Sequence, residues 1–146
     1  MEDEHYAFLL VAEEKYWKRL VQDNKQSKKI RFFVRKRQVG PTEAKKLLFY
    51  IKKTQKQIRG TADFVERITG NAEELWNQYG SESFFESFDE YKAFADGRKK
   101  MTFIRFQNFV EIANPKPKEM VARVLGSLVW LRPRYVSQQS ADLLTV

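Results

Sequence analysis

The segment Arg31–Arg37 mixes cationic side chains with apolar ones, in the order Arg-Phe-Phe-Val-Arg-Lys-Arg. Successive side chains of a strand point to opposite faces, so Phe33 shares one face with three guanidiniums while Lys36 lies on the other. The shared face consists of Arg31, Phe33, Arg35 and Arg37. Guanidinium groups bind phosphate oxygens through a fork of donors and stack on bases. The spacing therefore predicts an RNA-binding strip on one face of a strand.

A second interpretation of the same segment is structural. A half-exposed barrel strand would also carry arginines, and their charges would be paired with carboxylates from the acidic part of the chain. Glu73, Glu86 and Glu90 are the available partners. The sequence leaves both interpretations open.

Two more basic clusters extend the candidate surface. Arg98 and Lys99 follow an Asp-Gly turn, where they either continue the strip or occupy a solvated loop tip. Arg132 and Arg134 flank Pro133, which stiffens the backbone and holds two guanidiniums and the phenol of Tyr135 in a fixed relation. We expect the segment Arg132–Tyr135 to complete the binding surface from the far end of the chain.

The usual catalytic sets are missing from the sequence. There is no Cys, His5 is the only imidazole, and the six glycines are scattered rather than gathered in a phosphate-binding loop. We expect a structural or surface role for His5, no metal site and no cofactor. For an enzyme, the remaining pattern is a lysine with a carboxylate, namely Lys28 or Lys29 with Asp63 or Glu66. That pattern is common in a chain with 32% charged residues.

The charge of the chain is strongly polarised. Residues 15–60 contain sixteen Lys and Arg against only Asp23 and Glu43, a net charge of +14, whereas the whole chain has a net charge of +8. Such polarity favours a polyanion as partner. A hydrophobic fraction of 42% with twelve Phe predicts one folded domain over residues 1–146. We expect a cytoplasmic protein without a membrane span, and a monomer by default.

Periodicity predicts the elements that would position these residues. The order is strand, helix, three strands, two helices, strand, helix, strand, helix, with Gly60 as a bulge or a close backbone approach, Asn71 as an N-cap and Gly80 as a helix stop. The strands are expected at 6–11, 29–37, 46–52, 58–68 and 101–112 with an extended segment at 130–137, and the helices at 13–24, about 71–80, 87–94, 118–124 and 138–144. The prolines at 115 and 117 predict a loop. Most strands are expected to be neighbours joined by short turns, which favours an α+β fold with a small barrel decorated by helices.

The order and spacing of several phrases resemble the PUA-like superfamily, specifically its ASCH and EVE group and a related uncharacterised archaeal family. The phrases are the strand and helix at 6–24, the basic strand at 28–37, KKLLFYIKK at 45–53, IRGTADFVERITG at 58–70, EELWNQYG at 73–80, the acidic helix, turn and long strand at 88–117, and the closing LRPRYVSQQSADLL. The resemblance covers nearly the whole chain. It implies a pseudo-β-barrel of about five to six strands with a cleft for RNA or a modified nucleotide.

The resemblance also implies particular residues and two kinds of function. It points to Lys28, Lys29, Arg31 and Arg35 and to the closing Arg132, Arg134 and Tyr135 as RNA-binding residues. Some ASCH proteins are nucleases or hydrolases of acylated nucleosides that use a Lys, a nearby Thr and a Glu. Lys29 and Glu66 match the Lys and the Glu, whereas no Thr follows Lys29. The leading hypothesis is therefore a non-enzymatic RNA-binding domain, with an ASCH-type hydrolase or a module that docks an acidic protein as alternatives.

Overall fold

The computed structural model describes residues 3–23, 30–37, 40–53, 55–126 and 132–146. In these residues the chain forms the succession of strands and helices that periodicity predicts. The strands are β1 (Ala7–Ala12), β2 (Phe32–Arg35), β3 (Lys46–Ile51), β4 (Gln57–Asn71), β5 (Lys100–Pro117) and β6 (Arg134–Val136). The helices are α1 (Glu14–Asp23), α2 (Ala72–Tyr79), a short 3-10 turn (Gly80–Glu82), α3 (Phe88–Ala95), α4 (Lys118–Leu125) and α5 (Gln138–Thr145).

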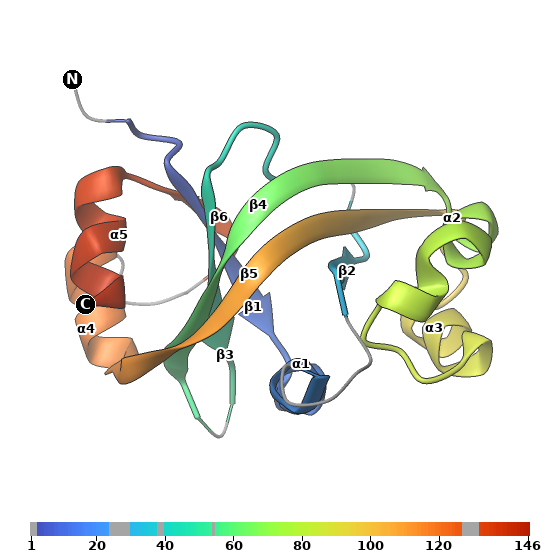
Figure 1. Ribbon diagram of the computed structural model, residues 1–146, viewed down its shortest axis with the longest axis horizontal. Helices are drawn as coiled ribbons and strands as arrows, with labels where there is room; N and C mark the ends of the chain where they lie inside the picture. Colours follow the sequence, from blue (N-terminus) through green and yellow to red (C-terminus); the bar gives the residue numbers. More distant parts are fainter. Residues whose placement is uncertain (1–2, 24–29, 38–39, 54, 127–131) are drawn as a thin grey trace.

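All six strands belong to one curved sheet in the order β2-β5-β4-β3-β1-β6. The main part of this sheet is formed by β4 and β5, which run antiparallel along most of the molecule (Figure 1). β1 pairs in parallel with β3, although α1 and β2 lie between them in the sequence. The expectation that most strands would be sequential neighbours is therefore wrong: among the described residues, a short turn joins neighbouring strands only between β3 and β4.

The two faces of the sheet carry separate hydrophobic clusters. Phe8 and Leu10 of β1 point into the larger cluster, which is rich in aromatic residues and includes side chains of α1, α2 and α3. Leu9 points into the smaller cluster, which α4 and α5 cover at the opposite end of the molecule (Figure 1). Burial on both faces explains why the sequence of β1 is a continuous apolar run and does not alternate between apolar and polar residues.

Local signals in the sequence determine several element boundaries. The side chain of Asn71 caps α2 by accepting a hydrogen bond from the Glu74 N–H at 3.0 Å, and α2 ends just before Gly80, as predicted. Gly60 is confirmed both as a bulge and as a close approach. The β4–β5 register shifts beside it, and a Cβ added there would lie 2.6 Å from the Trp17 ring.

Two predicted boundaries are wrong. β5 continues through Pro117 instead of ending in a loop, because Ile58 and Gln57 pair with Lys116 and Pro117 beyond a register shift. Prolines are tolerated in a strand at such irregularities, where the regular ladder of hydrogen bonds is interrupted. In the described part of the basic segment, β2 comprises only four residues, since its pairing with β5 ends at Arg35 opposite Thr102.

Over the residues that the structure describes, the sheet does not close into a barrel. β2 and β6 are its two edges, so the basic segment and the Arg-Pro-Arg-Tyr segment border the open side of the fold. The expected α+β pseudo-barrel of about six strands is confirmed in this open form. None of the described helices has the length and apolarity needed to cross a membrane.

Candidate RNA-binding cleft

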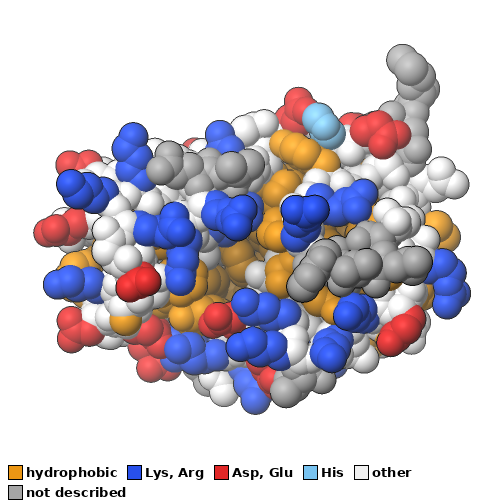
Figure 2. All heavy atoms as spheres, turned by 180° about the vertical axis from the view of Figure 1, so that it is seen from behind, with side chains coloured by type: hydrophobic (Ala, Val, Ile, Leu, Met, Phe, Trp, Pro, Cys, Tyr) orange, Lys and Arg blue, Asp and Glu red, His pale blue; other side chains and the backbone are white. Residues whose placement is uncertain are grey.

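A cleft of about 780 Å³ lies on the open side of the sheet. Residues of both edge strands line it, together with residues of β1, α1 and α3. Figure 2 shows this side of the molecule, where Lys and Arg side chains surround a hollow in which hydrophobic side chains are visible. The cleft therefore combines a cationic rim with an apolar interior.

In the described part of the chain, six cationic side chains line the cleft, and they come from three separate parts of the sequence. They are Arg35, Lys36, Arg37, Lys52, Arg132 and Arg134. Among the described residues that line the cleft, Glu13 has the one carboxylate, which lies 3.9 Å from the ammonium of Lys52. An excess of cations in a concave site raises the local concentration of anions. The cleft is thus suited to a ligand with more than one negative charge.

Aromatic rings position two of the cations. The Arg35 guanidinium lies over the Phe8 ring, 5.7 Å from its centroid, and burial, with a further contribution from the charge of Arg37, lowers its pKa. The Lys36 ammonium lies 4.9 Å from the centroid of Phe94 on α3. Cation–π contacts of this kind hold a charge at the surface without neutralising it. Both cations are thus held beside an aromatic ring of the cleft lining.

Tyr135 of β6 is fixed at one end of the cleft. Its hydroxyl oxygen accepts a hydrogen bond from the Thr42 N–H at 2.9 Å, and its ring stacks on His5 at a centroid distance of 4.0 Å. His5 in turn is paired with Glu43. The expected structural or surface role of His5 agrees with this position, and Tyr135 forms a rigid wall beside the two arginines of its segment.

Most aromatic rings of the cleft are buried in the core. Phe33 is only 5% exposed and packs against Phe49 and Phe84, so the prediction that it stands open between guanidiniums is wrong. The apolar character of Phe33 places it in the larger cluster, where it forms part of the cleft floor. Phe94 and Tyr135 are half-buried and line the cleft, where Lys36 lies over the Phe94 ring and His5 stacks on the Tyr135 ring.

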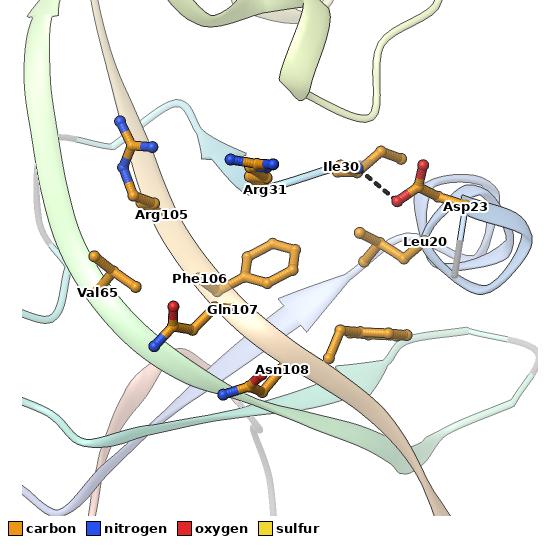
Figure 3. Close-up of a pocket in the computed structure, with 10 residues that line it drawn as sticks. Leu20, Asp23, Ile30, Arg31, Val65, Arg105, Phe106, Gln107 and Asn108 are labelled. Carbon is orange, nitrogen blue, oxygen red and sulfur yellow. Dashed lines mark hydrogen bonds between the residues drawn. The ribbon is translucent and has the colours of Figure 1, made fainter. Parts of the chain in front are cut away.

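Arg31 is separated from the other arginines of its segment. It precedes β2, its side chain is 53% exposed, and its Nε lies 3.6 Å from a carboxylate oxygen of Glu82. Arg31 lines a second cavity of about 530 Å³, beside Arg105 and above Phe106 (Figure 3). The predicted strip of three arginines is therefore divided between two cavities, because the strand is too short to carry the alternation from residue 31 to residue 37. Lys36 was expected on the opposite face of the strand, but it follows the end of β2 and lines the cleft.

The remaining predicted residues lie elsewhere. Arg98 and Lys99 line a third cavity between α2 and α3, and neither lines the cleft. Lys28 and Lys29 are outside the described residues. Glu66 is half-exposed, and its carboxylate accepts a hydrogen bond from Arg105 at 2.9 Å. The Lys29 and Glu66 pair of the hydrolase hypothesis stays a prediction.

The sequence analysis missed several residues of the cleft. Lys52 belongs to a basic turn, but its place in the cleft depends on the parallel pairing of β3 with β1, which no local pattern indicates. Glu13 and Phe94 reach the cleft through the packing of α1 and α3. Within the described ranges, no group of three His, Cys, Asp or Glu side chains is arranged to hold a metal ion.

Solved structures share this fold at low sequence identity. The ASCH protein from Zymomonas mobilis superposes with a TM-score of 0.78 at 18% identity, over 94% of this chain and 92% of that protein. A variant of it reaches a TM-score of 0.79 over 97% of this chain and 95% of that protein, also at 18% identity. The N-terminal domain of McrB from Staphylothermus marinus is more distant, with a TM-score of 0.54 at 9% identity over 97% and 94% of the two chains.

The comparison with solved structures shows that the chain has the fold of this ASCH protein. No curated protein matches the chain at a significant level. A family model matches residues 10–130, which include α1 to α4, the second half of β1 and all of β2 to β5. The chain therefore belongs to the DUF365 family, described as a domain of unknown function.

Proposed function

We propose that this protein binds RNA, or a modified nucleotide, through the basic cleft between β2 and β6. The observation that carries the proposal is the convergence of Arg35 and Arg37 with Arg132 and Arg134, which are separated by about two thirds of the chain. Their charges meet in a concave site whose described lining includes one carboxylate, that of Glu13. Phosphate groups are the ligand class that best matches several guanidiniums in one cleft.

The dimensions of the cleft favour a single-stranded ligand. Its volume of about 780 Å³ is within the usual range of small-molecule sites, so it would accommodate an unpaired nucleotide rather than a duplex. Proteins read single-stranded RNA by stacking its bases on aromatic rings. Phe94 and Tyr135 present such rings next to the cations.

A titration of single-stranded and double-stranded RNA at low salt tests the proposal. We expect the single strand to bind more tightly, and its affinity to fall with salt with a slope of about −0.7 per phosphate neutralised. No binding of either RNA at low salt would refute the proposal. Polyglutamate serves as the competitor: if it displaces RNA at equal charge concentration, the cleft would more simply be a docking site for an acidic protein.

A further inference from the structure

The cavity of about 530 Å³ beside Arg31 is separate from the cleft. Among the described residues, the two sites have no lining residue in common. Residues 105–109 of β5 form one side of the cavity, and residues of α1 and of the segment before β2 form the other. The side chains of Arg31, Gln107 and Asn108 are exposed, so a ligand can reach them.

Two guanidiniums lie toward one end of this cavity (Figure 3). The backbone of Arg31 is fixed on both sides, because its N–H donates to the Glu82 carbonyl oxygen at 2.8 Å and its carbonyl oxygen accepts from the Phe106 N–H at 2.9 Å. The carboxylates of Glu82 and Glu66 contact Arg31 and Arg105 through Nε, and neither carboxylate lines the cavity. Within the described residues, the Nη atoms of both arginines make no hydrogen bond, and donors of this kind bind phosphate oxygens in pairs.

Two carboxamides lie toward the other end of the cavity (Figure 3). Asn108 donates from Nδ2 to a carboxylate oxygen of Asp63 at 2.7 Å, so its Oδ1 is the atom that can accept from a ligand. The side chain of Gln107 has no hydrogen bond to another described residue, and it offers both a donor and an acceptor. Carboxamides recognise adenine in this way, accepting from its amino group and donating to a ring nitrogen.

Apolar side chains lie between the two polar ends. The Phe106 ring is central in Figure 3, with Val65 of β4 and Leu20 of α1 on either side of it. Phe106 is 3% exposed and forms part of the floor, whereas Val65 is 42% exposed at the rim. Asp23 accepts a hydrogen bond from the Ile30 N–H, so its carboxylate belongs to the wall. The volume is within the usual range of small-molecule sites.

We propose that this cavity binds one nucleotide, with its phosphate on Arg31 and Arg105 and the amino-bearing edge of adenine or cytosine on Gln107 and Asn108. The nucleotide is either a free monophosphate or an unpaired unit of an RNA strand, and both present the same chemistry. The assignment is based on the residues of the cavity itself and does not depend on ligand binding in the cleft. It gives the protein a second nucleotide site on β5.

A titration with AMP, followed by the NMR shifts of the backbone amides, separates the two sites. Saturable shifts at residues 105–109 report binding in the cavity, and shifts at residues 34–37 and 134–136 report binding in the cleft. From the cavity shifts, AMP should bind more tightly than adenosine or ribose 5-phosphate, because each of these lacks the group for one end of the cavity. AMP should also bind about fivefold more tightly than inosine monophosphate, which has an oxygen in place of the amino group.

Two variants test the two ends of the cavity. Arg31→Gln should weaken AMP and ribose 5-phosphate about tenfold and leave adenosine unchanged, since only the phosphate loses its partner. Gln107→Ala should weaken AMP and adenosine about fivefold and leave ribose 5-phosphate unchanged. Both side chains are exposed, so the melting temperature should hardly change. The matched controls are Arg98→Gln and Gln78→Ala, which change exposed residues outside the cavity and should bind AMP like the wild type.

A single-stranded oligoadenylate identifies the source of the nucleotide. If Arg31→Gln weakens the oligoadenylate as well as AMP, the cavity binds a unit of an RNA strand. If it weakens AMP alone, the ligand is a free mononucleotide. Both results support the site.

The outcomes for the two sites are independent. If millimolar AMP shifts no amide of residues 105–109 in the wild type, or if the two variants bind AMP like the wild type, the cavity proposal is wrong, and the cleft proposal is still decided by its own RNA titration. If the cavity amides shift and the variants divide phosphate from base as expected, the cavity proposal is supported even where the cleft binds no RNA.

Discussion

Arg19 of α1 and Glu90 of α3 join the two helices that border the cleft. The Nη1 of Arg19 donates to Glu90 Oε1 at 2.6 Å and also to the carbonyl oxygen of Phe84 at 2.9 Å. Both side chains are mostly buried, with 19% and 21% of their surface exposed. Because the guanidinium bonds to a protein carboxylate and a backbone carbonyl, it supports the wall of the cleft instead of facing a ligand.

This pair makes the stability of the protein sensitive to acid. The hydrogen bond from Arg19 lowers the pKa of Glu90 from its usual 4.5 to about 2. A carboxyl group with a lowered pKa stabilises the folded state above its unfolded pKa, and that contribution is lost as the pH falls from about 4.5 to about 2. Urea denaturation of the wild type and Glu90→Gln over this range should differ by at most about 3 kcal/mol at neutral pH, with the difference disappearing towards pH 2.

Glu86 provides the control for that experiment. It lies 3.4 Å from the Nε of Arg19, but its side chain is 72% exposed. Glu86→Gln should change the free energy of unfolding by less than about 1 kcal/mol, as is usual for surface ion pairs. Equal losses of unfolding free energy in the two variants would show that the Arg19–Glu90 hydrogen bond stabilises the protein no more than the exposed Arg19–Glu86 pair.

Gly60 is required by the close packing of α1 on the sheet. An added Cβ would lie 2.6 Å from a Trp17 ring carbon and 3.1 Å from the carbonyl oxygen of Val110. Gly60→Ala should therefore force the ring or the strand to move and destabilise the protein by about 1 to 3 kcal/mol. The midpoint of urea denaturation measures this change.

Gly70 in the same strand is the matched control for Gly60. Its added Cβ would meet only the Leu75 side chain, at an ordinary contact distance of 3.9 Å. Gly70→Ala should leave the stability unchanged or raise it slightly, since alanine restricts the unfolded chain. A similar loss in both variants would indicate that the contact with Trp17 is not the cause.

Arg98 and Lys99 should contribute little to RNA binding. They line the cavity between α2 and α3, and not the cleft. Arg98→Ala/Lys99→Ala should reduce RNA affinity by less than about twofold at physiological salt, where distant charges are screened. A loss comparable to that of a cleft variant would extend the binding surface to this end of the molecule.

Much of the fold is predictable from local patterns. The apolar run that becomes β1, the aromatic face of α1 and the Asn71 cap each determine an element through neighbouring residues. The parallel pairing of Leu9 with Leu48 is different, because a parallel neighbour is selected by packing of the whole sheet.

The candidate site was predicted in part. Pro133 and the cations around it indicated a binding segment, and the structure places this segment in one cleft with Arg35 and Arg37. Arg31 was misplaced because strand alternation was extended over seven residues, whereas β2 is regular only from Phe32 to Arg35. Phe33 lies within β2, and it is buried because its ring packs in the larger hydrophobic cluster. The end of a strand depends on its pairing partner, which the segment itself does not reveal.

The central claim is that the cleft binds RNA, and the measurement that tests it most directly is the RNA affinity of Arg37→Ala/Arg134→Ala. Both side chains are exposed, so their removal should hardly alter the melting temperature. We predict that this variant binds single-stranded RNA at least about tenfold more weakly at low salt, with a shallower salt slope, while Arg123→Ala on α4 binds like the wild type. Wild-type affinity in the cleft variant, together with an unchanged melting temperature, would contradict the account.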